Sequence, residues 1–225
     1  MRIDVGAIAE NITAIRKALP SGVMLVAVSK TKPAVLIEEA YQAGQRVFGE
    51  NRAQEMAEKH LALPKDIEWH MIGHMQSNKV KYIAPFVSLI HSIDGLSLLQ
   101  EVNKQAKANN RVIDCLLQFH IAEEENKYGL NLEESLDMLS CSEYKELKNI
   151  RVCGVMGMAT FTDNNAQLHK EFAHLNRIFG QLKSEVFSDQ SDFKHISMGM
   201  SGDFQIAIEE GSTMVRIGSS LFGSR

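Results

Sequence analysis

Short apolar segments alternate with amphipathic ones along the whole chain, and this alternation limits the possible folds more than any other feature. The short apolar segments fit strands that are buried on both faces, and the amphipathic segments fit helices. Strands and helices in alternation are typical of a parallel sheet. The predicted strands are Val23–Val28, Arg46–Phe48, Glu68–Ile72, Val87–His91, Ile113–His120, Val152–Met156, His195–Ser197 and Met214–Ile217.

The segments between these strands have the apolar spacing of helices. The predicted helices are Pro33–Ala43, Arg52–His60, Ser77–Ile83, Gly95–Ala108, Leu132–Ser140, Asn164–Phe187 and Asp203–Glu210, with an additional helix at Asp4–Leu19 before the first strand. Three polar residues, Thr31, Asn51 and Ser201, lie where helix-capping residues are expected.

Eight strands alternating with helices in 225 residues fit one closed barrel. The expected fold class is therefore α/β, a single-domain (β/α)₈ TIM barrel with an extra N-terminal helix. A doubly wound open sheet is the alternative. Because no Pro-rich, Gly-rich or low-complexity linker divides the chain, residues 1–225 are expected to form one domain.

Charge and cysteine content narrow the class of protein. A net charge of -4 gives no general attraction to nucleic acid or to an anionic membrane surface. Cys115, Cys141 and Cys153 are an odd, widely spaced set that indicates free thiols in a reducing compartment. Neither a signal peptide nor a membrane-spanning apolar run is present in the sequence, so a cytoplasmic location is expected.

Lys30 is the first candidate for chemistry. It follows the strand Val23–Val28 and shares a face with Val26 and Val28, because side chains alternate along a strand. Burial favours the neutral amine of a lysine, which makes Lys30 a candidate Schiff-base nucleophile. The alternative is that Lys30 only enters solvent where the strand ends.

Two turns of small residues are candidates for holding a phosphate group. Gly218 and Ser219 follow the last strand, and the turn 199–202, which contains Met200 and Ser201, follows the strand before it. In a barrel of this kind, the loops after the last two strands often bind phosphate, and residues 221–223 are expected to form a short helix there.

Arg216 lies inside the last apolar strand, where its charge needs a partner. One interpretation is an ion pair with Asp203, Glu209 or Glu210. The other interpretation is that Arg216 binds a ligand. Facing a pyridine nitrogen, Arg216 would keep that nitrogen an unprotonated acceptor and so weaken the ring as an electron sink.

His70 and His74 have the spacing of a helical metal pair, but their strand-like surroundings argue against metal binding.

Six motifs, in order along the chain, closely resemble those of the pyridoxal phosphate homeostasis protein family. The motifs are VAVSKTK (26–32), FGENR (48–52), WHMIGHMQSNK (69–79), GVMGM (154–158), SMGMS (197–201) and GSTMVRIG (211–218). The resemblance covers the chain from the first predicted strand to the last residues. It implies a barrel similar to the N-terminal domain of alanine racemase.

The same resemblance implies that the chain holds pyridoxal 5'-phosphate (PLP) as an internal aldimine on a lysine. Lys30 matches that lysine, and Arg216 matches the residue that faces the pyridine nitrogen. Phosphate-holding positions match Ser201, Gly218 and Ser219, while Asn51 approaches the cofactor from the second strand. Met200 and His195 are further expected neighbours, and no metal is expected.

The resemblance also implies a carrier or storage protein for PLP with no catalytic residues of its own. In the racemases, the second base is a tyrosine from a second domain, and this sequence has no tyrosine at an equivalent position. Tyr128, near the end of a strand, is the local candidate for a substitute. A minimal PLP-dependent amino-acid racemase is therefore the alternative function. Expected partners are PLP, apo forms of PLP-dependent enzymes and free amino acids, and the protein is expected to be a monomer.

Overall fold

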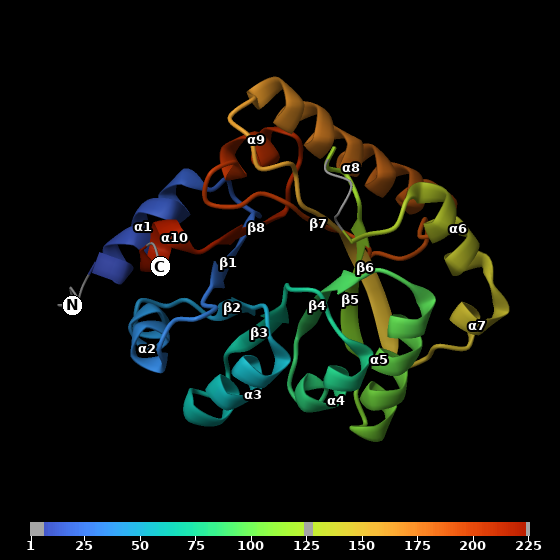
Figure 1. Ribbon diagram of the computed structural model, residues 1–225, viewed down its shortest axis with the longest axis horizontal. Coiled ribbons are helices and arrows are strands. Elements are labelled where there is room, and N and C mark those ends of the chain that lie inside the picture. Colours follow the sequence, from blue (N-terminus) through green and yellow to red (C-terminus); the bar gives the residue numbers. More distant parts are fainter. Residues whose placement is uncertain (1–6, 124–127, 224–225) are drawn as a thin grey trace.

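Eight parallel strands close into a ring at the centre of the molecule (Figure 1). The computed structural model describes residues 7–123 and 128–223. Each strand pairs with the next one in sequence, and the last pairs with the first, so the predicted barrel is confirmed and the open sheet is wrong. The strands are β1 (Met24–Val28), β2 (Val47–Glu50), β3 (Glu68–Met71), β4 (Leu89–Ile93), β5 (Ile113–Phe119), β6 (Ile150–Gly157), β7 (His195–Ser197) and β8 (Met214–Ile217).

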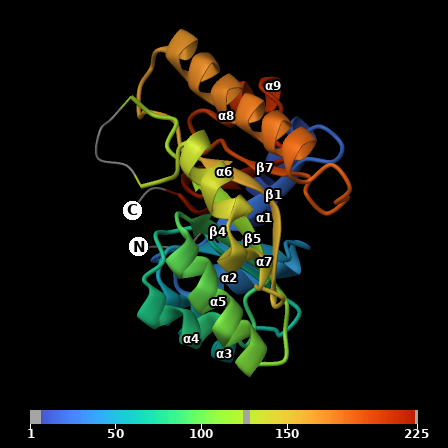
Figure 2. The same ribbon diagram turned by 90° about the vertical axis from the view of Figure 1, so that its right-hand side faces the viewer.

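The helices lie outside this ring, as the two perpendicular views of the ribbon show (Figures 1 and 2). Their bounds are α1 (Ala7–Ala18), α2 (Ala34–Gln42), α3 (Ala53–Ala62), α4 (Val80–Ile83), α5 (Leu96–Ala108), α6 (Leu132–Ser140), α7 (Ser142–Lys145), α8 (Asn165–Glu185), α9 (Phe204–Glu209) and α10 (Ser219–Phe222). The predicted helix at 77–83 begins as a 3₁₀ turn, η1 (Ser77–Lys79). The short α7 was not predicted. Residues 4–6 of the predicted first helix lie outside the described residues.

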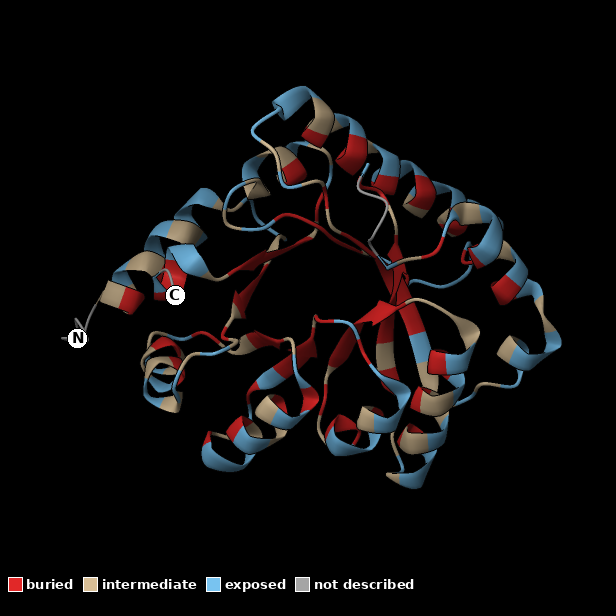
Figure 3. Cartoon of the chain, in the orientation of Figure 1, coloured by how far each residue is buried: buried red, intermediate tan, exposed pale blue. Residues whose placement is uncertain are grey.

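Two apolar layers explain why the strands are apolar on both faces. The larger layer lies between the strands and the helices, and the long α8 contributes Leu168, Phe172 and Leu175 to it at helical spacing. The smaller layer fills the inside of the ring with residues such as Val26, Met156 and Met214. Figure 3 shows the buried residues along the strands and on the inward sides of the helices.

A glycine allows β6 to change register between its neighbours. The pairing of β5 with β6 shifts at Cys115 and Leu116, whose partners are Val152 and Gly154. Gly154 has a φ of 155°, and an added Cβ would lie 1.9 Å from the carbonyl oxygen of His195. Any larger residue would therefore push β6 and β7 apart.

The predicted helix caps are wrong. Pro33, Arg52 and Asp203 occupy the N-cap positions of α2, α3 and α9, and none of them makes a side-chain capping hydrogen bond. Asn51 and Ser201 instead line a pocket at one end of the barrel. Their polar groups therefore face a cavity and do not cap helix ends.

Among the residues that the structure describes, no helix combines the length and the apolar character needed to cross a membrane.

Candidate functional site

A pocket of about 420 Å³ opens at the ends of six of the eight strands. Its lining residues lie at the carboxyl ends of the strands or directly after them, on the face where barrels of this type build their sites. These strands are β1, β2, β3, β6, β7 and β8. The volume lies within the usual range for small-molecule sites.

All seven residues predicted as a binding site line this pocket. They are Lys30, Asn51, Met200, Ser201, Arg216, Gly218 and Ser219. The structure therefore brings together residues that are up to 189 positions apart in the chain. His195 does not belong to this group, because it begins β7 at the far end of the strand and does not line the pocket. The role of the seven lining residues in binding a ligand stays a prediction.

Helix α3 holds the backbone on both sides of Lys30. Lys59 donates from Nζ to the carbonyl oxygen of Ser29 at 2.8 Å, and Glu55 accepts the backbone N–H of Thr31 at 2.6 Å. Thr31 has a φ of 64°, which is uncommon for a β-branched residue. Strained backbone of this kind persists only where its surroundings enforce it. The contacts from α3 thus fix the turn that carries Lys30.

A buried ion pair supports these contacts. Lys59 Nζ lies 2.7 Å from Glu50 Oε1 and 2.7 Å from Glu55 Oε1, while the Ser29 hydroxyl donates to Glu50 at 2.6 Å. Burial raises the pKa of Glu50, and the bonds from Lys59 and Ser29 offset this only in part. Because removing one partner would leave a buried charge unpaired, the four residues act as one unit.

Asn51 brings an unused acceptor to the pocket. Its Oδ1 atom is buried and has no hydrogen-bond partner among the described residues. Gly73 lets the segment after β3 pass directly against Asn51, since an added Cβ would lie 2.5 Å from the Asn51 carbonyl oxygen. Buried polar atoms are rarely left without a partner, so this one indicates that a ligand or water completes the site.

A hydrogen bond joins the two turns of small residues. Ser201 Oγ, after β7, accepts the backbone N–H of Gly218, after β8, at 3.2 Å. Ser219 follows at the start of α10 and also lines the pocket, whereas Ser220 does not. Hydroxyl groups and backbone near small residues thus border one side of the pocket, which suits a group with several acceptor oxygens.

Arg216 lies at the inner end of the pocket and is 4% exposed. Its guanidinium donates from Nη1 to Ser197 Oγ at 2.6 Å and from Nη2 to the carbonyl oxygen of Gly157 at 3.0 Å. Both acceptors are neutral. Burial lowers the pKa of Arg216 to about 10, and the charge of Asp203 acts in the opposite direction. The guanidinium still carries its positive charge at neutral pH.

The alternative of a buried ion pair at Arg216 is wrong for the described residues. Glu209 and Glu210, two of the three candidate partners, both pair with His169. Asp203 accepts the backbone N–H of Met200 at 2.5 Å. With neutral acceptors behind it, Arg216 keeps its charge for whatever occupies the pocket.

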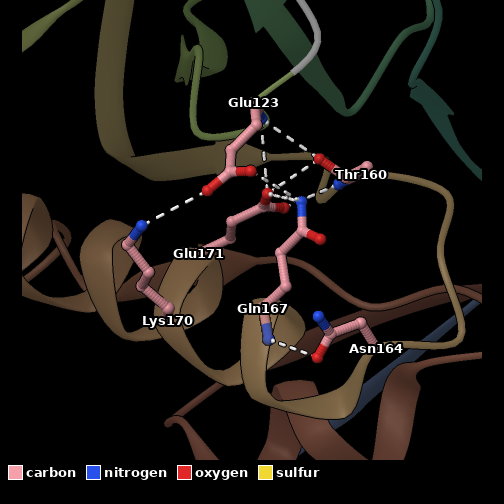
Figure 4. Close-up of polar contacts among 6 residues, drawn as sticks. All are labelled: Glu123, Thr160, Asn164, Gln167, Lys170 and Glu171. Carbon is pink, nitrogen blue, oxygen red and sulfur yellow. Dashed lines mark hydrogen bonds and ion pairs between the residues drawn. The ribbon is translucent and has the colours of Figure 1, made fainter.

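A buried carboxylate, Glu171, holds the segment at Thr160 that follows β6 and forms one wall of the pocket (Figure 4). Glu171, on α8, accepts the backbone N–H and the hydroxyl of Thr160, each at 2.7 Å, and the side-chain amide of Gln167 at 3.0 Å. The backbone N–H of Glu123 adds a bond at 3.3 Å. Burial alone would raise the pKa of Glu171, but these bonds together hold it below its ordinary value. Thr160 itself lines the pocket.

The sequence did not identify several residues that build this site. Lys59, Glu55 and Glu171 lie on helices, where charged residues at these positions look like ordinary surface residues. Thr160 lies in a loop without a recognisable motif. Ser197 and His91 did carry a signal, because each is a polar residue in an apolar strand, but only the closed barrel shows what they contact.

Comparison with known proteins places this geometry in a known group. A family model described as the alanine racemase N-terminal domain matches residues 3–225. The pyridoxal phosphate homeostasis protein of Aquifex aeolicus is 42% identical over 203 residues, which cover 89% of this chain and 86% of that protein. The protein of the same name from Escherichia coli is 38% identical over 213 residues, covering 92% of this chain and 87% of the relative.

Solved structures agree with the sequence comparison. PipY of Synechococcus elongatus, solved without PLP, superposes with a TM-score of 0.89 at 35% identity, covering 96% of this chain and 100% of PipY. The structure of PipY with PLP bound gives a TM-score of 0.85 at 34% identity, with the same coverage. Alanine racemase from Bartonella henselae shares the fold, with a TM-score of 0.74 at 18% identity over 99% of this chain and 60% of the racemase.

Proposed function

The chain belongs to the pyridoxal phosphate homeostasis protein family, and from this premise we propose that it binds PLP in the pocket at the carboxyl ends of the strands and acts in PLP homeostasis as a carrier. One observation carries the proposal. A lysine in the turn that follows β1 and a buried arginine with neutral acceptors behind it line the same pocket. PipY, with 34% identity and PLP bound, supports the choice of cofactor.

The residues of the pocket fit PLP group by group. Lys30 offers an amine to the aldehyde; the nitrogen would add to the aldehyde carbon and one water would leave. Ser201, Gly218 and Ser219 offer hydroxyl and backbone groups to the phosphate. Arg216 offers N–H donors to the ring nitrogen, and Asn51 and Met200 complete the surroundings. PLP, once bound, supplies a reactive carbonyl and a ring that withdraws electrons.

The pocket residues favour a carrier over the racemase alternative. A racemase needs a proton donor or acceptor on each face of the substrate. The described residues that line the pocket include no tyrosine, histidine or cysteine, and besides Lys30 and Arg216 their titratable members are Lys32, Asp163 and Asp203. Lys32 and Asp203 bond to backbone groups near the pocket rim. Tyr128, the candidate substitute, stacks on His74 with a 4.0 Å centroid separation and is not a lining residue. Arg216 in place of a carboxylate at the ring nitrogen would also weaken the ring as an electron sink.

The setting and the partners of the protein are part of the same proposal. Three cysteines without disulfides fit the reducing environment of the cytoplasm. Apo forms of PLP-dependent enzymes are the proposed recipients, and free amino acids are proposed to react with the loaded pocket. A monomer is proposed because the exposed large apolar residues among those described come from different elements, such as Val35 on α2, Leu61 on α3, Val112 before β5 and Phe161 after β6.

Borohydride trapping tests the binding proposal. The protein is incubated with PLP, reduced with borohydride, digested, and examined by mass spectrometry. We expect the reduced pyridoxyl group on Lys30, with little or none on Lys32, whose amine already donates to the carbonyl oxygens of Phe222 and Gly223. Lys30→Ala should abolish the trapped product and the absorption band of the bound cofactor.

Two outcomes would contradict the proposed function. Label on Lys32 or spread over surface lysines would mean that the pocket does not select Lys30. Exchange of the α-proton of an amino acid with solvent, well above the rate with free PLP and lost in Lys30→Ala, would favour the racemase.

A further inference from the structure

A line of buried polar side chains crosses the inside of the barrel below the pocket. Arg216 on β8, Ser197 on β7, His91 on β4 and His70 on β3 are at most 4% exposed. Ser197 Oγ lies 2.6 Å from Arg216 Nη1 and 3.0 Å from His91 Nδ1, and His91 Nε2 lies 3.0 Å from His70 Nδ1. Of the four residues, only Arg216 lines the pocket.

The chemistry of these side chains determines which of them donates and which accepts in each hydrogen bond of the line. A guanidinium only donates, so Ser197 Oγ accepts from Arg216. Burial, followed by the charge of His195, lowers the pKa of His70 to about 3. Burial, followed by the charges of His70, Arg216 and His195, lowers the pKa of His91 well below its ordinary value. Both rings are therefore neutral, and each carries one N–H.

Only one arrangement gives both Ser197 and His91 a partner for their polar hydrogens among the described contacts. The Ser197 hydroxyl donates to His91 Nδ1, and His91 Nε2–H donates to His70 Nδ1. In the reverse arrangement, His91 Nδ1–H would donate to Ser197 Oγ, and His70 Nδ1–H would donate to His91 Nε2. Ser197 Oγ would then accept from both Arg216 and His91, and its own hydroxyl hydrogen would be buried without an acceptor among the described contacts. A buried donor without a partner costs free energy, so the first arrangement is favoured. Both histidines then carry their proton on Nε2.

We propose that Ser197, His91 and His70 are positioning residues that hold Arg216 toward the pocket through this one-way chain of hydrogen bonds. Because the acceptors are neutral, they orient the guanidinium and leave its charge for an acceptor atom of the ligand. This inference rests on the proposed function, since it takes that atom to be the ring nitrogen of PLP. Gly157 provides the second fixed point through its carbonyl oxygen.

Histidine tautomers test the chain directly and need no ligand. Long-range ¹H–¹⁵N spectra of protein labelled at histidine distinguish the two neutral tautomers and the charged ring. At pH 7 we expect His91 and His70 to be neutral with the proton on Nε2, assigned by the loss of each signal in His91→Asn and His70→Asn. A proton on Nδ1 of His91, or a charged ring, would overturn the proposal.

Paired variants then test the link to Arg216. Ser197→Ala should shift the guanidinium ¹⁵N signals of Arg216 and the absorption band of bound PLP, and should weaken PLP binding by about tenfold. Ser92→Ala is the matched control, because Ser92 is equally buried on β4 and its hydroxyl has no hydrogen-bond partner among the described residues. It should leave all three readouts unchanged.

A second pair covers the case in which Ser197→Ala does not fold. His91→Asn keeps an acceptor oxygen close to Ser197, whereas His91→Leu has none. The Arg216 signals and the absorption band should stay close to the wild type in the first variant and shift in the second. Equal behaviour of the two variants would overturn the role of His91.

Different results would contradict PLP binding and the chain of hydrogen bonds. If no PLP is trapped on Lys30, the proposed function fails, and the Arg216 signals of the ligand-free variants still decide whether the chain of hydrogen bonds exists. If PLP is trapped on Lys30 and Ser197→Ala changes neither the Arg216 signals nor the absorption band, the further inference fails alone.

Discussion

Lys30 and Lys32 are two residues apart and line the same pocket, yet the structure gives them different surroundings. Lys32 extends to the carbonyl oxygens of Phe222 and Gly223, close to the end of the chain. Lys30 follows Val26 and Val28 on the inner face of β1, in a turn held by Lys59 and other groups of α3. Residue type alone therefore does not decide which lysine meets a ligand.

Ser219 and Ser220 form a similar pair, and they yield a prediction at the scale of a single hydroxyl group. Both are exposed residues of α10, but only Ser219 lines the pocket. Ser219→Ala should weaken PLP binding by about 1–3 kcal/mol, because a hydrogen bond to the phosphate is lost. Titration followed by the absorption of bound PLP measures this change.

Ser220→Ala is the control for that experiment and should bind PLP as the wild type does. Equal affinity of both variants and the wild type would show that the phosphate does not lie against α10. Both variants should unfold at the wild-type temperature, because neither side chain is buried.

At the scale of elements, helix α8 supports the pocket through one residue. Glu171 accepts bonds from Thr160, Gln167 and Glu123, and so connects α8 to the segments that follow β5 and β6 (Figure 4). Helix α8 packs against β6 and β7. The pocket wall at Thr160 therefore depends on a helix that does not itself reach the pocket.

Glu171→Ala should loosen that wall while the barrel remains folded. Hydrogen exchange of the Thr160 amide should become about 10- to 100-fold faster, because its bond to a charged carboxylate is lost. Bound PLP should also dissociate faster. Exchange measured by mass spectrometry on peptides that cover residues 158–164 provides the test.

Glu185→Ala is a matched control on the same helix. Glu185 is exposed at the end of α8 and bonds only to Gln181 among the described contacts, so its loss should not alter exchange at Thr160. If Glu171→Ala also leaves this exchange unchanged, Glu171 does not anchor the wall.

At the scale of the whole molecule, the buried histidines make the barrel sensitive to acid. The pKa of His70 is lowered by burial to about 3, and that of His91 is lowered well below its usual value for the same main reason. Below about pH 6.5, the unfolded chain therefore binds more protons than the folded one. The stability that the neutral rings contribute is present above that pH and is lost as the pH falls toward 3.

We expect each of the two histidines to add about 1 kcal/mol per pH unit to the loss of unfolding free energy between about pH 6 and pH 4. Urea unfolding of the wild type and of the double variant His70→Leu/His91→Leu measures the two slopes. The double variant should show the smaller slope, whatever its stability at pH 7. Equal slopes would mean that the rings are not held neutral in the folded state.

Much of the architecture was predictable because it depends on local pattern. Apolar segments such as Val23–Val28 and Met214–Ile217 were recognisable as strands, and their number and alternation with helices indicated the closed barrel. The site residues at strand ends, from Lys30 to Ser219, were predictable because parallel strands in a barrel all point the same way.

The helix caps could not be predicted from the local sequence. Asn51 and Ser201 have the residue type and position of N-caps, but tertiary structure directs both toward the pocket. A side chain near a helix start can bond to the helix or face a cavity. The choice depends on the neighbouring loops, which the local sequence does not describe.

Periodicity and family motifs were enough to predict the strands and helices, the barrel, and the lysine, arginine and serines at its carboxyl end. The supporting contacts appear only in the folded chain: Lys59 and Glu55 hold the turn of Lys30, Glu171 anchors the pocket wall, and Ser197, His91 and His70 lie behind Arg216. These contacts depend on closure of the sheet. A closed barrel brings interior side chains from distant strands within hydrogen-bonding distance, and no local pattern records which of them meet.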